Sequence, residues 1–249
     1  MRGVFPGFIV TLAEAEHRAG RIPATLSTNR LGKWSAFGQF LIGIADIVML
    51  TLGFAVHGLS EPIVDPLLAI MEVLTLVSAP LLVVMMAAIH GYASPDRKTH
   101  SLISLAFVIL LAGTTSAVHF AELTALRQLG DAGIVWPSAA YAVELLAWNL
   151  FLGLSLLFAA PVFEGGGLAR RIRRAFLVSG ALCLAGIVGP AVGNMRLQLV
   201  GVLGYAVVLP ITCFMVSRLF NGDPQPRATP AAWTAEKRRS HVPGDAVHE

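Results

Sequence analysis

Six apolar runs, each long enough to cross a lipid bilayer, dominate this 249-residue sequence and restrict the folds open to it. A spanning helix needs about 20 apolar residues, because the hydrocarbon core is about 30 Å thick. Backbone groups inside lipid must find their hydrogen bonds within the chain, which favours helices. The pattern predicts an all-α, polytopic integral membrane bundle of six transmembrane helices. The runs are Phe37–Leu59, Ile63–Ile89, Leu102–Leu126, Trp136–Ala160, Ala175–Val192 and Leu197–Phe220.

Two of these runs contain residues that disturb a regular helix. Pro80 lies in the second run and predicts a tilt or a kink there. The end of the fifth run holds Gly186, Gly189, Pro190 and Gly193, so we expect that end to be irregular.

The distribution of basic residues predicts which side of the membrane each connection occupies. Of the 18 lysines and arginines, all but Arg127 and Arg196 lie before the first run, in the second or fourth connection, at the end of the sixth run, or in the tail. Connections rich in lysine and arginine stay in the cytoplasm, so both termini are predicted to be cytoplasmic. The same rule accounts for the net charge of +3, and we therefore expect no nucleic acid partner.

The chain divides into three parts. Residues 1–35 form a cytoplasmic N-terminal segment, 36–220 the six-helix transmembrane domain, and 221–249 a polar tail without apolar periodicity, which predicts disorder. Besides the bilayer itself, we expect anionic lipid as a partner of a basic cluster in the fourth connection. This cluster consists of Arg170, Arg171, Arg173 and Arg174.

Four carboxylic acids interrupt the apolar runs: Asp46, Glu72, Glu122 and Glu144. Placing an ionisable side chain in hydrocarbon costs about 2.5–3.5 kcal/mol, so such residues point to a functional site. We expect no lysine or arginine at a comparable depth to neutralise them.

Helical spacing indicates that these acids share polar stripes with other side chains. Thr115, His119 and Glu122 fall on one face of the third helix, and Glu144 and Trp148 on one face of the fourth. Each of the first two helices also has a polar stripe that contains its acid. Such stripes face the bundle interior, because lipid offers them no partner. The predicted substrate- or proton-binding site, in the outer half of the bundle, consists of Asp46, Glu72, His119, Glu122 and Glu144.

Three chemistries fit this set of residues. Carboxyls buried without a basic partner can load and release protons, as a transporter of a small solute or ion requires. Alternatively, His119 and Glu122 are candidate metal ligands, because both lie on one helix face. A third chemistry is acid–base catalysis by His119 and a carboxylic acid. A purely structural role also stays open, in which protonated acids hydrogen-bond across helix interfaces. The residues specify no cofactor.

The second half of the chain resembles a group of uncharacterised, small, six-helix bacterial integral membrane proteins. The resemblance rests on the stretch from Glu144 to Asn149, the segment Phe158–Pro161, and the Ser179–Gly180 pair. It implies a location in the inner (plasma) membrane and implies no activity.

We therefore expect a multi-pass membrane protein that handles a small solute or ion through a protonatable site. One alternative is a membrane-embedded enzyme, metal-dependent or not, that acts on a lipid-like substrate. Another is a non-catalytic assembly subunit whose glycine-rich helix faces pack against a partner subunit.

Overall fold

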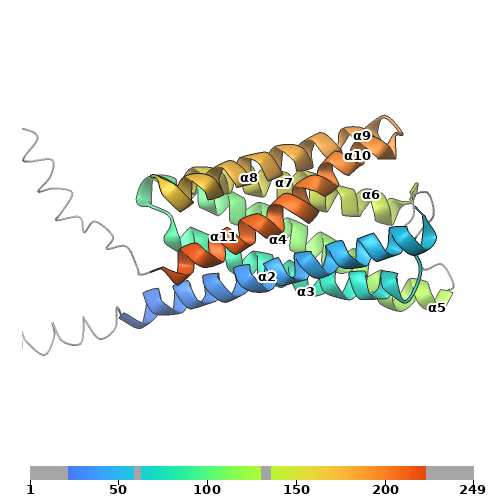
Figure 1. Cartoon of the computed structure of the whole chain (residues 1–249), viewed down its shortest axis with the longest axis horizontal. Helices are drawn as coiled ribbons and strands as arrows, with labels where there is room; N and C mark the ends of the chain where they lie inside the picture. The colour runs from blue at the N-terminus through green and yellow to red at the C-terminus, as the bar shows by residue number, and fades with distance from the viewer. Residues whose placement is uncertain (1–21, 59–62, 130–135, 223–249) are drawn as a thin grey trace, which may run out of the picture.

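The computed structural model describes residues 22–58, 63–129 and 136–222, which form helices and short connections (Figure 1). Within these residues the fold is all-α, and six helical spans are long and apolar enough to cross a membrane. The predicted fold class is therefore confirmed at this level. Most of the predicted N-terminal segment and almost all of the predicted tail lie outside the described residues. The spans are Ser27–His57, Leu67–Tyr92, Pro95–Leu129, Ala139–Val162, Gly167–Ala191 and Met195–Asn221.

Two spans are single helices and four are divided into shorter elements. The single helices are α2 (Ile22–His57) and α3 (Leu67–Tyr92). The third span comprises η1 (Pro95–Arg97), α4 (Lys98–Ala121), η2 (Glu122–Leu126) and α5 (Arg127–Leu129). The fourth comprises α6 (Ala139–Leu145), η3 (Leu146–Phe151), α7 (Leu152–Ala159) and η4 (Ala160–Val162). The last two comprise α8 (Gly167–Gly186) and α9 (Val188–Ala191), then α10 (Met195–Val202), η5 (Leu203–Val208) and α11 (Leu209–Asn221).

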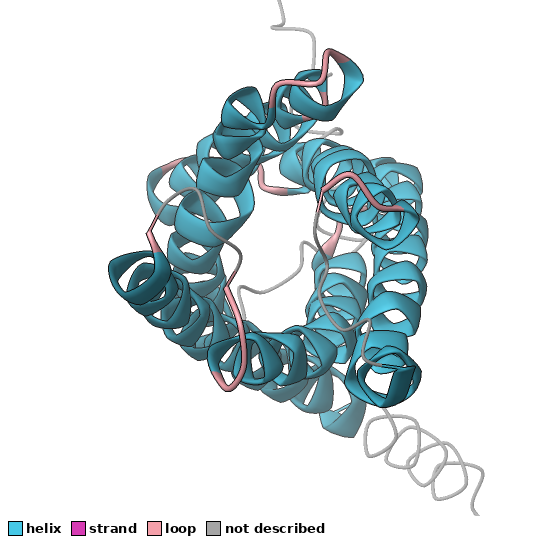
Figure 2. Cartoon of the chain, turned by 90° about the vertical axis from the view of Figure 1, so that its right-hand side faces the viewer, coloured by secondary structure: helices cyan, strands magenta, loops and turns pink. Residues whose placement is uncertain are grey.

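The six spans surround one common axis, as the end-on view in Figure 2 shows, and the contacts between them follow the order of the sequence. Helix α2 packs against α3, α3 against α4, α4 against α7, and α7 against α8. Helix α8 contacts α10, and α11 returns to pack against α2, which closes the ring. Chain neighbours are therefore also spatial neighbours, as short connections between antiparallel helices favour.

Apolar side chains fill the interior and also cover the outside of the bundle. Leu82, Val108, Leu111 and Phe176 are buried in one continuous core. Large apolar side chains are also exposed along the outer faces. Examples on α2 are Leu31, Leu41, Ile44, Val48, Leu52 and Val56. An apolar exterior of this extent suits lipid rather than water.

Two helix boundaries differ from the apolar runs. The third span continues to Leu129, so Arg127, expected in a connection, lies on a helix. Likewise α8 begins at Gly167, which places the basic cluster Arg170–Arg174 on its first turns rather than in a connection. Both differences have the same cause: a helix needs only backbone hydrogen bonds, so it continues where its composition becomes polar. The irregular end predicted for the fifth span is confirmed, because α8 stops at Gly186 before the short α9.

Three of the divided spans contain wide, π-helical turns. These turns are η2, η3 and η5. Turn η2 begins at Glu122, η3 includes Trp148 and Asn149, and η5 includes Tyr205. Such turns are rare and often occur at functional sites.

Glycines allow the fourth, fifth and sixth spans to approach closely around Asn149. A Cβ atom added at Gly201 would lie 2.1 Å from Asn149 Oδ1 and 3.2 Å from the Cα atom of Gly186. We expect Gly201→Ala to destabilise the bundle by about 1–3 kcal/mol, because this clash forces backbone apart. The measurement is the unfolding free energy in mild detergent. Gly113→Ala is the control, since its added Cβ meets nothing within 4 Å; a loss as large in the control would contradict the account.

Candidate functional site

The carboxyl group of Glu144 lies at the centre of a polar cluster between α4 and the fourth span. Its Oε1 atom accepts hydrogen bonds from Thr115 Oγ1 at 2.6 Å, His119 Nε2 at 2.9 Å and Trp148 Nε1 at 2.5 Å. The indole N–H of Trp148 can only donate, so Oε1 is an unprotonated acceptor. Three donors therefore converge on one carboxyl oxygen of Glu144.

Local helical geometry produces this cluster. Thr115 and His119 are four residues apart on α4, and so are Glu144 and Trp148 across α6 and η3. Residues four apart lie one above the other on a helix, so each helix presents two polar groups to its neighbour. The structure thus brings His119 and Glu144 of the predicted set into direct contact.

His119 connects this cluster to the acids on α2 and α3. Its Nε2 atom contacts Glu144, while its Nδ1 atom is buried and has no hydrogen-bond partner among the described residues. The ring lies close enough to Asp46 and Glu72 for its charge to act on both carboxyls. If Nε2 carries the proton donated to Glu144, Nδ1 is the nitrogen that gains or loses the second proton.

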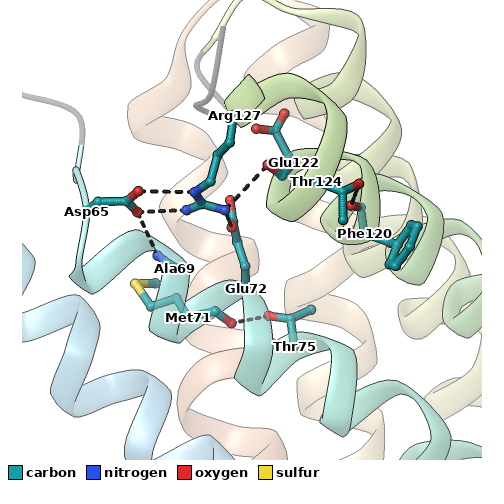
Figure 3. Close-up of polar contacts among 9 residues, drawn as sticks. All are labelled: Asp65, Ala69, Met71, Glu72, Thr75, Phe120, Glu122, Thr124 and Arg127. Carbon is teal, nitrogen blue, oxygen red and sulfur yellow. Dashed lines mark hydrogen bonds and ion pairs between the residues drawn. The ribbon is translucent and has the colours of Figure 1, made fainter. Parts of the chain in front are cut away.

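A second polar cluster is built around Arg127 (Figure 3). Arg127 contacts Asp65 through Nε at 3.1 Å and Nη2 at 2.7 Å, and it contacts Glu72 Oε2 through Nη1 at 2.7 Å. The Glu72 side chain is 1% exposed, whereas that of Asp65 is 54% exposed. Arg127 therefore joins an acid at the rim to a fully buried one.

The contact between Arg127 and Glu72 corrects the expectation that no arginine or lysine neutralises the buried acids. The apolar run ends at Leu126, which suggested a loop position for Arg127. Because the helix continues, the long side chain of Arg127 reaches inward to the first turns of α3. The available signal was the spacing of Asp65 and Glu72, which lie two turns apart and so share one face.

Glu122 lies next to this second cluster rather than beside Glu144. Glu122 is 1% exposed and begins the wide turn η2. Its backbone carbonyl accepts a hydrogen bond from Arg127 Nη1 at 3.4 Å. Glu122 also lies close enough to Glu72 for the two carboxyls to interact electrostatically.

Four of the five predicted site residues have a buried polar atom that lacks a hydrogen-bond partner within the described part of the chain. They come from four different spans, and the three acids among them lie within hydrogen-bonding or electrostatic reach of the fourth, His119. Buried polar atoms normally have partners, so this concentration is an exception to that rule. The atoms are Asp46 Oδ1, Glu72 Oε1, His119 Nδ1 and Glu144 Oε2.

The geometry of the described residues provides no set of ligands for a metal ion. Across residues 22–58, 63–129 and 136–222, no group of three or more His, Cys, Asp or Glu side chains is arranged to hold a metal ion. The Nε2 atom of His119 contacts Glu144 rather than a metal position shared with Glu122. The pairing of His119 and Glu122 as metal ligands stays a prediction.

An apolar layer separates the candidate site from a smaller polar group deeper in the bundle. On the buried face of α4, Val108 and Leu111 are 0% exposed and lie between Thr115 and Ser104. Beyond this layer, Ser155 donates to the backbone carbonyl of Ser104 at 2.9 Å. The candidate site therefore belongs to the end of the bundle where α3 begins and α4 ends.

The ion pair at the rim gives the fold an acid-sensitive contact. Hydrogen bonds from Arg127 hold the pKa of Asp65 below its ordinary value near 3.8. A lowered pKa in the folded state stabilises the fold above the unfolded-state pKa, and this contribution disappears as the pH falls below about 4. We expect Asp65→Asn to flatten the fall in unfolding midpoint between pH 5 and pH 3, by a small amount because Asp65 is half exposed. An unchanged pH profile in the variant would contradict this role.

Comparisons with known proteins identify no relative: no family model, no curated protein and no solved structure matches this chain.

Proposed function

We propose that this protein is a multi-pass membrane protein that moves a small solute or ion through a protonatable site. The site consists of His119, Glu144, Asp46 and Glu72, with Glu122 beside them. The proposal is carried by one observation: His119 and three acids from the other three of the first four spans each have a buried polar atom without a hydrogen-bond partner among the described residues. A purely structural cluster would satisfy these atoms with one another.

His119 is suited to carry the proton. Its Nε2 atom is held in place by the hydrogen bond with Glu144. Its Nδ1 atom is then the exchangeable position, within electrostatic reach of Asp46 and Glu72. Histidine serves in this way because its charge changes near neutral pH. A proton on Nδ1 would alter the charge felt by both acids at once.

The proposed orientation follows from the basic residues at one end of the bundle. The start of α2, the start of α8 and the end of α11 lie together at the left of Figure 1. Arg30, Arg97, Arg170 and Arg218 belong to this end. We infer that it faces the cytoplasm, which places the candidate site in the outer half. A location in the inner (plasma) membrane follows from the resemblance of the second half to bacterial membrane proteins.

The basic cluster on α8 supports contact with the membrane surface. Arg170, Arg171, Arg173 and Arg174 are exposed, while Ile172 between them is buried. Each such side chain near an anionic leaflet contributes about 1 kcal/mol. The cluster therefore supports binding of anionic lipid headgroups.

Proton-coupled flux across proteoliposomes tests the proposal. The purified protein is reconstituted with a pH-sensitive dye inside, a pH gradient is imposed, and a panel of small cationic, anionic and neutral solutes is added in turn. We expect at least one solute to dissipate the gradient in the wild type and not in His119→Gln. His57→Gln at the end of α2 is the matched control. Equal flux in the wild type and His119→Gln for every solute would contradict the proposal.

A further inference from the structure

We propose that the solute is an organic ammonium ion, which competes with protons for the oxygens of Asp46, Glu72 and Glu144. This inference rests on the proposed function, because it assigns a ligand class to the same site. It is argued from the charges, the orientation of the unpartnered atoms, and the aromatic rings beside Glu144.

The charges around His119 favour a cation. Among the described residues, ion pairs join Asp65 and Glu72 to Arg127, and Glu144 to His119, while Asp46 lies within electrostatic reach of His119 and Glu122 within reach of Glu72. With both bases positively charged and all five acids ionised, three negative charges remain. Charges in a low-dielectric interior are stable only when they are paired or neutralised. Either protons or a bound cation must supply the balance.

Three of the unpartnered atoms are oxygen acceptors, as the N–H groups of an ammonium ion require. Asp46 Oδ1, Glu72 Oε1 and Glu144 Oε2 are carboxyl oxygens from three different spans. A metal ion requires several ligands at one short distance from a single point. An organic ammonium instead directs separate N–H groups, each of which can reach its own oxygen.

Arg127 already binds the other oxygen of Glu72 through an N–H group, which is the kind of contact we propose for the ammonium ion. The guanidinium of Arg127 binds Glu72 Oε2, and Glu72 Oε1 on the same buried carboxyl stays without a partner. His119 supplies a second, independent indication, because this residue is 8% exposed and its Nδ1 atom also lacks a partner. In this site, one carboxyl oxygen therefore already accepts an N–H group, and several other acceptors have no donor.

Two aromatic rings border the site on the side of Glu144. Trp148 donates to Glu144, and its ring centroid lies 5.4 Å from that of Tyr205. Both residues are partly buried. Ring faces attract organic cations, and tryptophan does so best. An ammonium ion with an apolar substituent could therefore place its charge on the acids and its substituent against Trp148.

Binding of this cation would release protons. An ammonium ion bound among these oxygens adds positive charge, which repels a proton held by the carboxyls or by the neighbouring His119, and the released proton passes to solvent. No covalent bond forms or breaks. The exchange supplies the coupling that the proposed function requires, because cation and proton depend on the same negative charges.

Three probes that share a ring and differ in charge provide the test. Benzylammonium, benzyl alcohol and benzoate are titrated into the full-length protein in mild detergent at pH 7. Heat and proton release in weak buffer are recorded. We expect saturable binding with proton release for benzylammonium alone. We expect Asp46→Asn to weaken this binding at least tenfold, whereas Glu164→Gln, which removes an exposed acid paired with Arg97, leaves it unchanged.

The outcomes separate this inference from the proposed function. Binding of benzoate or benzyl alcohol with equal or higher affinity would overturn the assignment of a cation, as would the absence of benzylammonium binding. If benzylammonium fails to bind while His119→Gln abolishes flux of another solute, the inference fails and the proposed function stands. Should Asp46→Asn fail to fold, the comparison of the three probes on the wild type still decides.

Discussion

Arg127→Gln is expected to destabilise the bundle by about 3–5 kcal/mol, the largest effect of any single substitution considered. Glu72 is 1% exposed, and Arg127 is the cation that contacts it at 2.7 Å. Removing one partner of a buried ion pair leaves an uncompensated charge in a low-dielectric site. The unfolding free energy in detergent, obtained by titration with a denaturing detergent, measures the loss.

Two controls isolate the buried charge as the cause. Arg97→Gln removes an arginine from an ion pair with Glu164 whose side chains are 39% and 51% exposed. Exposed pairs contribute about 1 kcal/mol at most, so this variant should stay near the wild type. Adding Glu72→Gln to Arg127→Gln should recover part of the lost stability, because the buried charge is then absent. Equal losses for Arg127→Gln and Arg97→Gln would show that the pair with Glu72 is not formed.

Glu144→Gln is expected to reduce proton-coupled flux at least tenfold while leaving the fold intact. Glutamine retains an oxygen that can accept from Thr115, His119 and Trp148, so the geometry of the cluster survives. The negative charge is lost, however, and with it the electrostatic attraction that this carboxylate exerts on a cation or proton in the site. Because 1.4 kcal/mol corresponds to a factor of ten, a loss of that size in this attraction accounts for the expected change.

Flux in proteoliposomes, with the unfolding free energy measured in parallel, checks this result. Glu164→Gln is the matched control, since it removes a carboxylate from an exposed position. Full flux in Glu144→Gln would mean that the charge of Glu144 is not used. A fall in flux accompanied by unfolding would assign Glu144 a structural role instead.

The number and type of helices could be predicted from the sequence, because both depend on local composition. Apolar length alone indicates six spans, and the glycines and Pro190 indicate an irregular end to the fifth. Helix ends were less accurate, since a helix continues beyond its apolar residues. This is why Arg127 and the Arg170–Arg174 cluster were expected in connections.

The candidate site could be predicted in part. Spacing on single helices placed Thr115 and His119 on one face, and Glu144 and Trp148 on another, and the structure brings these faces together. Which acid meets which base depends on helix rotation and depth, and no local pattern contains that information. For this reason the sequence could not predict two contacts. These are the pairing of Arg127 with Glu72 and the closing contact of α11 with α2.

The most direct test of the account is the protonation of His119, observed through the ¹⁵N chemical shifts of its imidazole in the intact protein in lipid. The account predicts that the neutral ring carries its proton on Nε2, because Nε2 donates to Glu144, and that Nδ1 is the acceptor. Glu144→Gln should remove the preference for the proton on Nε2. A ring that carries its proton on Nδ1 instead would contradict the account.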